Sequence, residues 1–83
     1  MEQNLSLYKI FDCVANTGNI SRAAKELYIS QPAISKAISK LEQNLEVTLF
    51  TRNSRGVHLT EEGKMLYEHT KSAFETLQIG EET

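Results

Sequence analysis

Apolar residues at helical spacing occupy the first part of the chain. Five of them fall at i, i+3, i+4, i+7 and i+8, namely Leu7, Ile10, Phe11, Val14 and Ala15. This spacing places them on one face of an amphipathic helix, which we predict over about residues 4–16. The Thr17-Gly18-Asn19 segment then ends the helix, because Gly18 can adopt a positive φ.

Two further helices are predicted, separated by a three-residue break at Tyr28-Ile29-Ser30. Asn19 or Ser21 can cap the first of them, and its buried face is Ile20, Ala23, Ala24 and Leu27. Ser30 can cap the next helix, and Pro32 falls in its first turn, where a missing N–H costs nothing. That third helix, over about residues 31–45, is expected to bury Ile34, Ile38, Leu41 and Leu45.

The opposite face of the third helix is polar and cationic. It presents hydrogen-bond donors and two lysines, without an acid or a large apolar group, at Gln31, Ser35, Lys36, Ser39, Lys40 and Gln43. A face of this kind suits contact with base edges and phosphates.

The apolar period changes after Leu45. The segments 47–52 and 57–60 have strand character, and Asn53-Ser54-Arg55-Gly56 between them has the composition of a turn. We therefore predict a small antiparallel ribbon with Arg52 and Arg55 near its tip.

A last helix is predicted from Thr60, which can cap it, to about Gln78, with Gly80 ending it. Glu61 and Glu62 lie in its first turn, where the helix dipole favours acids. A weak coiled-coil seam follows a 4-3-4 spacing, with two further apolar residues beside it: Leu66, Thr70, Ala73 and Leu77, flanked by Met65 and Phe74. We expect this seam to form a dimer interface, although it has the alternative of packing back onto the first helix.

Composition and charge narrow the class of protein. Eighty-three residues suit one small domain, whose core a partner subunit would help to stabilise. The net charge of −2 hides an uneven distribution, because residues 19–58 carry six basic and three acidic residues while residues 59–83 carry two and six. A basic middle segment matters more for phosphate contact than the total does.

Several classes of function are disfavoured by the residues. The apolar runs are too short for a membrane span or a secretory signal, and a single cysteine excludes an internal disulfide, so we expect a cytoplasmic protein with no membrane partner. Cys13 is interpreted as a buried core thiol, and His58 and His69 are too few for a metal site. No phosphate loop or nucleophile–base pairing indicates an enzyme, and we expect no metal or other cofactor.

The order of helix, short helix, break, longer helix and ribbon is that of a winged helix-turn-helix, a mainly α fold. In this fold the third helix enters the major groove of DNA with its first residues at the base edges. A Gln can pair with adenine in a bidentate manner, and a ribbon can place arginines on the backbone or in a narrow minor groove.

The same residues resemble a known family. The segment Ser30-Gln31-Pro32-Ala33-Ile34-Ser35, then Ile38, Leu41-Glu42, Leu45, Leu49-Phe50, Arg52 and Leu59-Thr60-Glu61-Glu62-Gly63 are similar to the N-terminal domain of the LysR-type transcriptional regulators, as are Ala23-Ala24 with Leu27. Members of this bacterial family carry a winged helix-turn-helix, a long linker helix that dimerises and a C-terminal effector domain. The resemblance implies a DNA-binding domain at 1–59 and a linker or dimerisation helix with its tail at 60–83. It implies that the effector domain is absent from this chain, so that a small-molecule effector would act only through that missing domain.

The resemblance also implies a set of DNA-binding residues at the starts of the second and third helices, along the third helix and in the wing: Ser21, Arg22, Ser30, Gln31, Pro32, Ser35, Lys36, Ser39, Lys40, Arg52 and Arg55. Two positions depart from the family pattern. Glu46 stands where the family usually has Gly, which predicts a strained or different turn after the third helix. Lys36 stands where Arg is frequent, and Lys lacks the fork for bidentate guanine recognition.

We therefore predict sequence-specific binding of double-stranded DNA for transcriptional regulation, by a homodimer on an inverted-repeat operator. The alternative is a winged-helix module that binds protein through the third helix. An apolar outer face on that helix would favour this alternative, and the face presented at Lys36 and Lys40 is polar and cationic.

Overall fold

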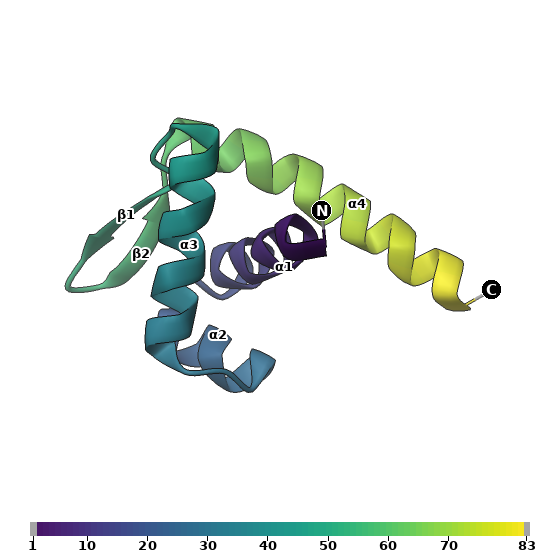
Figure 1. The fold of residues 1–83 in the computed structure, drawn as a ribbon, viewed down its shortest axis with the longest axis horizontal. Helices are drawn as coiled ribbons and strands as arrows, with labels where there is room; N and C mark the ends of the chain where they lie inside the picture. The colour runs from purple at the N-terminus through teal and green to yellow at the C-terminus, as the bar shows by residue number, and fades with distance from the viewer. Residues whose placement is uncertain (1, 83) are drawn as a thin grey trace.

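The structure is a computed structural model that describes the backbone of residues 2–82 and the side chains of residues 6–77. Its elements, in chain order, are α1 (Glu2–Thr17), α2 (Ile20–Leu27), α3 (Gln31–Leu45), β1 (Phe50–Asn53), β2 (Gly56–Leu59) and α4 (Glu61–Glu82) (Figure 1). This confirms the predicted mainly α winged helix-turn-helix followed by a long helix.

The core lies where α1, α2 and α3 meet the base of the wing. Its largest fully buried side chains are Phe11, Ile34, Leu41, Leu49 and Val14. The Phe11 ring packs against Phe50 of β1 with a centroid distance of 5.3 Å, which ties the wing to the first helix. The apolar faces predicted for α1 and α2 are confirmed, since their residues are buried or packed against this core.

The predicted burial of Leu45 is wrong. Its side chain is 38% exposed, whereas Ala37 is buried between Ile34 and Leu41 on the inner face of α3. Leu45 is the last residue of the helix, and the chain turns away at Glu46, so no further turn of α3 covers it.

Side-chain caps begin three of the helices, as predicted. Asn19 Oδ1 accepts a hydrogen bond from the Arg22 N–H at 3.0 Å, and Ser30 Oγ accepts one from Ala33 at 3.2 Å. Thr60 Oγ1 accepts one from the Gly63 N–H at 3.0 Å. Each cap satisfies an N–H that has no partner inside its helix and contributes about 1 kcal/mol.

Two of these helices end on residues in the left-handed region. Glu46 has φ 58° and ψ 37°, which is the strained turn that the sequence predicts. Tyr28 after α2 has φ 58° and ψ 40°, and nothing in the sequence indicated it. A bulky side chain rarely adopts this conformation. Both side chains are exposed, and each turn is closed by backbone hydrogen bonds, from the Tyr28 and Ile29 N–H groups to the Ala24 carbonyl and from the Glu46 and Val47 N–H groups to the last carbonyls of α3.

The wing is a two-stranded antiparallel sheet whose register runs from Phe50 opposite Leu59 to Asn53 opposite Gly56. Its first strand begins three residues later than the predicted segment 47–52. The physical reason is that Glu42 Oε2 accepts the N–H groups of Leu49 at 2.7 Å and Phe50 at 3.3 Å. The Leu49 carbonyl in turn accepts from the Thr60 N–H at 3.0 Å.

The start of α4 is pressed against that same segment. Gly63 is buried, and a Cβ on it would overlap the carbonyl oxygen of Leu49 and lie 2.9 Å from Leu59 Cδ2. A glycine is therefore required for the close approach. The helix then passes along α1 and extends beyond it (Figure 1).

The prediction that Gly80 ends the last helix is wrong, because α4 continues to Glu82. A glycine inside a helix costs only about 1 kcal/mol relative to alanine. No proline follows Gly80 to stop the helix.

Candidate nucleic-acid interface

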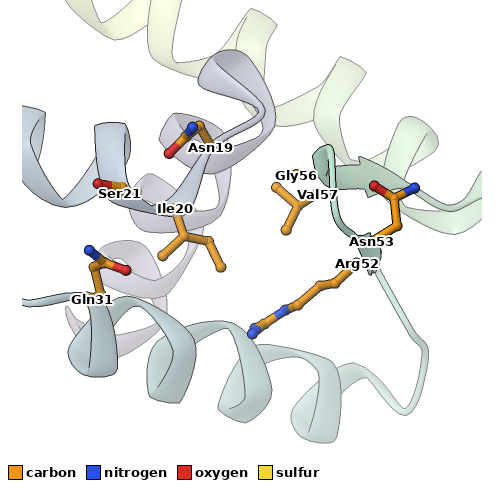
Figure 2. A pocket seen from close by; sticks show the side chains of 8 residues that line it. All are labelled: Asn19, Ile20, Ser21, Gln31, Arg52, Asn53, Gly56 and Val57. Atoms are coloured by element: carbon orange, nitrogen blue, oxygen red, sulfur yellow. The ribbon is translucent and has the colours of Figure 1, made fainter.

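A hollow of about 290 Å³ lies where the first residues of α2 and α3 face the wing. It is lined by Asn19, Ile20, Ser21, Gln31, Arg52, Asn53, Gly56 and Val57. Figure 2 shows Arg52 extending from the wing toward α3, while Gln31 projects from the first turn of α3 toward Ile20 and Ser21. We call this feature the wing hollow.

The wing is held beside α2 by contacts between two glycines. Gly18, at φ 68°, follows α1, and its carbonyl accepts a hydrogen bond from the Val57 N–H at 3.4 Å. Gly56 has φ 126°, and a Cβ on it would lie 2.8 Å from the Gly18 oxygen. This close approach holds Gly56 and Val57, two residues that line the wing hollow, against the end of α1.

The predicted DNA-binding residues lie at the starts of α2 and α3, along α3 and in the wing, and three of them meet at the wing hollow. Ser21, Gln31 and Arg52 meet at the wing hollow. Ser39 and Lys40 lie farther along α3, and Arg55 lies in the turn between the strands. Ten of the eleven are exposed and Ser35 is half-buried, the exposed ones being Ser21, Arg22, Ser30, Gln31, Pro32, Lys36, Ser39, Lys40, Arg52 and Arg55.

Basic side chains dominate the charge of this surface. Of the three acids of the central segment, Glu42 is half-buried with its carboxylate on the N–H groups of Leu49 and Phe50, Glu46 lies past the end of α3, and Glu26 is exposed on α2, where it accepts a hydrogen bond from Cys13 of α1. The N-terminal ends of α2 and α3 both border the hollow and carry the positive end of the helix dipole. The arrangement can therefore accept a polyanion.

Sequence reasoning missed several residues of this site. Ile20, Asn53 and Val57 line the hollow without having been predicted there. Asn53 Oδ1 also accepts a hydrogen bond from the Arg55 N–H at 2.8 Å, which shapes the tip of the wing. The Asn-x-Arg spacing in a turn was the available signal for that bond, because Asn commonly bonds its own backbone two residues on.

A second, apolar groove of about 280 Å³ lies between α1 and α4. It is lined by five of the six predicted dimerisation residues together with two others: Leu66, Thr70, Ala73, Phe74 and Leu77, with Tyr8 and His69. Met65 lies outside it and is 64% exposed. Thr70 is buried within the protomer and donates a hydrogen bond to Asp12, so part of the predicted seam packs back onto α1.

The remaining candidate groups make no second site in the part of the chain that the structure describes. Cys13 is half-buried, and burial, followed by the charges of Glu26 and Asp12, raises the pKa of its thiol. Among the described side chains, those of residues 6–77, no cluster of three suited to a metal is found. No helix in this range is long and apolar enough to cross a membrane.

Comparison with known proteins identifies the arrangement. Residues 5–64 match the family of bacterial regulatory helix-turn-helix proteins of the lysR type. The chain is 46% identical over 76 residues to the HTH-type transcriptional regulator PerR of Escherichia coli K12, covering 92% of this chain and 26% of PerR. The chain thus spans about a quarter of the length of such curated relatives.

Solved structures show the same fold. The DNA-binding domain of BenM in complex with catB site 1 DNA superposes with a TM-score of 0.84 at 31% identity, over 89% of this chain and 83% of that one. The DNA-binding domain of CbnR, also in complex with DNA, has a TM-score of 0.82 at 35% identity, over 99% of this chain and 92% of that one.

Proposed function

We propose, from the premise that this chain belongs to the lysR family of bacterial regulatory helix-turn-helix proteins, that it binds an inverted-repeat operator as a homodimer. Its helix-turn-helix domain is that of a transcriptional regulator. The proposal concerns how these residues contact DNA and how two copies associate.

The wing hollow is the observation that carries the proposal. It joins two helix N-termini, the uncharged hydrogen-bonding groups of Ser21 and Gln31, and the Arg52 guanidinium on one open surface. In this reading α3 enters the major groove, where Gln31 and the half-buried Ser35 read base edges.

Charged side chains around the hollow then contact the DNA backbone. Lys36 and Lys40 are exposed on α3 and are placed to meet phosphates beside the groove. Arg55 at the wing tip contacts the backbone or the adjacent minor groove. The rival function, docking of a protein on α3, is disfavoured because the exposed face of this helix carries polar and basic groups where a protein interface places apolar anchors.

A second copy is proposed to cover the α1–α4 groove. Leu77 is 54% exposed and Met65 is 64% exposed, so α4 presents unpartnered apolar surface along the groove and beside it. Two DNA-binding units joined by a two-fold axis double the contacts and require a palindromic site. Binding of a small-molecule effector is proposed to lie outside these 83 residues, as the greater length of the relatives allows.

Selection of bound sequences from random duplex DNA tests the proposal. We expect enrichment of an inverted repeat whose half-sites are separated by about 10 base pairs or a multiple of that, because both units must face one side of the duplex. Enrichment of a single asymmetric half-site would contradict the dimer, and no enrichment at all would contradict sequence-specific binding.

A further inference from the structure

Two polar bonds connect α1 to α4. The Thr70 hydroxyl donates to Asp12 Oδ1 at 2.8 Å, and the Tyr67 hydroxyl donates to Asn16 Oδ1 at 3.2 Å. Asp12 and Asn16 are one turn apart on α1, and Tyr67 and Thr70 are one turn apart on α4, so the two bonds share one line of contact. We call these four residues the α1–α4 clasp.

The burial of Thr70 distinguishes the clasp from an incidental surface contact. Thr70 is 7% exposed, and among the residues whose side chains the structure describes it is the one polar residue that is buried. A buried hydroxyl needs an acceptor, and the Thr70 hydroxyl has two in reach, Asp12 Oδ1 at 2.8 Å and the Tyr67 carbonyl of α4 itself at 3.2 Å. The shorter of the two bonds, to Asp12, is the one that ties Thr70 to α1. The neighbouring contacts of Leu66 are apolar and tolerate sliding, whereas a hydrogen bond fixes direction and length.

We propose that the clasp sets the separation of the two recognition helices in the dimer, and with it the half-site spacing that the protein accepts. This inference rests on the proposed dimeric function. Within a protomer, α3 packs on α1 through the shared core, while the proposed dimer contact lies on α4. The angle between α1 and α4 therefore determines how far α3, which reads the DNA, lies from the two-fold axis of the dimer.

The length of α4 amplifies small changes of that angle. About 20 Å of helix separate Glu61 from Phe74 at a rise of 1.5 Å per residue. A swing of about 10° over this distance displaces the dimer contact by about 3.5 Å, which is close to the roughly 3.4 Å rise of one base pair. Without the clasp, the protein is thus expected to accept half-site spacings that differ by one base pair or more with similar affinity.

The test compares variants of the 83-residue chain on duplexes that carry two copies of the half-site recovered by selection. The spacing between the half-sites is changed by one and two base pairs in either direction, and a duplex with one half-site serves as reference. Thr70→Val combined with Tyr67→Phe removes both hydroxyl donors with little change of shape. Thr76→Val is the matched control, because the Thr76 hydroxyl donates to Ser72 at 2.9 Å within α4 itself.

Thr70→Ser keeps the hydroxyl that donates to Asp12, so this variant should retain the spacing preference of the wild type. We expect the wild type, Thr76→Val and Thr70→Ser to prefer one spacing by about tenfold over its neighbours in fluorescence anisotropy. The double variant should bind a single half-site as the wild type does, but discriminate between spacings by about threefold or less. If the double variant loses its helical circular dichroism, Tyr67→Phe alone is judged by the same ratio of affinities.

Full spacing discrimination in the clasp variants would overturn the inference and leave the proposed function intact. A wild-type chain that binds two half-sites no better per site than one would overturn the dimeric function and this inference together.

Discussion

Replacing Glu46 with glycine is expected to stabilise the protein. Glu46 has φ 58° and ψ 37°, and a residue with a Cβ costs about 1–2 kcal/mol in that conformation. Glycine removes this cost, but it also gives the unfolded chain more conformational freedom, which lowers the free energy of unfolding by about 0.5–1 kcal/mol. The expected net gain in the free energy of unfolding is about 1 kcal/mol, which for a domain of this size raises Tm by about 4–8 °C.

The control for this prediction is Glu46→Ala. Alanine removes the same charge from the end of α3 but retains the Cβ, so it isolates the charge effect. A charge at a helix end is worth about 0.3–1 kcal/mol. Thermal melts followed by circular dichroism compare the three proteins at equal concentration. A Tm for Glu46→Gly that does not exceed that of Glu46→Ala would refute the backbone-strain reasoning.

Three further outcomes follow from particular contacts. Gly63→Ala should lower the free energy of unfolding by about 3 kcal/mol in denaturant titrations, because its Cβ would overlap the Leu49 carbonyl, and a loss below about 1 kcal/mol would contradict this packing. Glu42→Ala should cost about 2 kcal/mol by leaving the N–H groups of Leu49 and Phe50, at the start of the wing, without an acceptor, with Glu42→Gln costing less, and equal melts for both would refute that role. Burial and the charges of Glu26 and Asp12 raise the pKa of the Cys13 thiol, so its thiolate should form at higher pH than that of an ordinary cysteine. Alkylation of Cys13 by iodoacetamide at pH 8 should therefore be slower than alkylation of free cysteine. An equal rate would contradict the raised pKa.

The helices and their caps could be predicted from the sequence because the signals are local. The apolar positions of α1 repeat every three or four residues, and the capping bond of Ser30 reaches a residue three positions ahead. The positive φ at Tyr28 had no such signal, because neither glycine nor asparagine stands there. The Tyr28 side chain is 93% exposed, and the turn is closed by backbone hydrogen bonds to the Ala24 carbonyl, which any residue type can make and which the sequence therefore does not reveal.

The wing and its hollow were predicted less completely because they depend on contacts between distant segments. The start of β1 is fixed by the carboxylate of Glu42, seven residues before Leu49. The wing is held against the end of α1 by the approach of Gly56 to Gly18, which are far apart in the chain. Arg52 was predicted in the wing from turn composition, but the hollow it shares with Gln31 required the folded arrangement.

The central claim is that the surface around the wing hollow reads base sequence, and one comparison of affinities tests it most directly. Gln31→Ala is measured on the selected operator and on random duplex, beside Lys40→Ala, over a range of salt concentrations. Loss of a bidentate base contact should weaken operator binding by about 1–3 kcal/mol while leaving random duplex nearly unchanged. Lys40→Ala should weaken both duplexes alike and lower the salt slope by about one. Equal losses of Gln31→Ala on operator and random duplex would contradict the account.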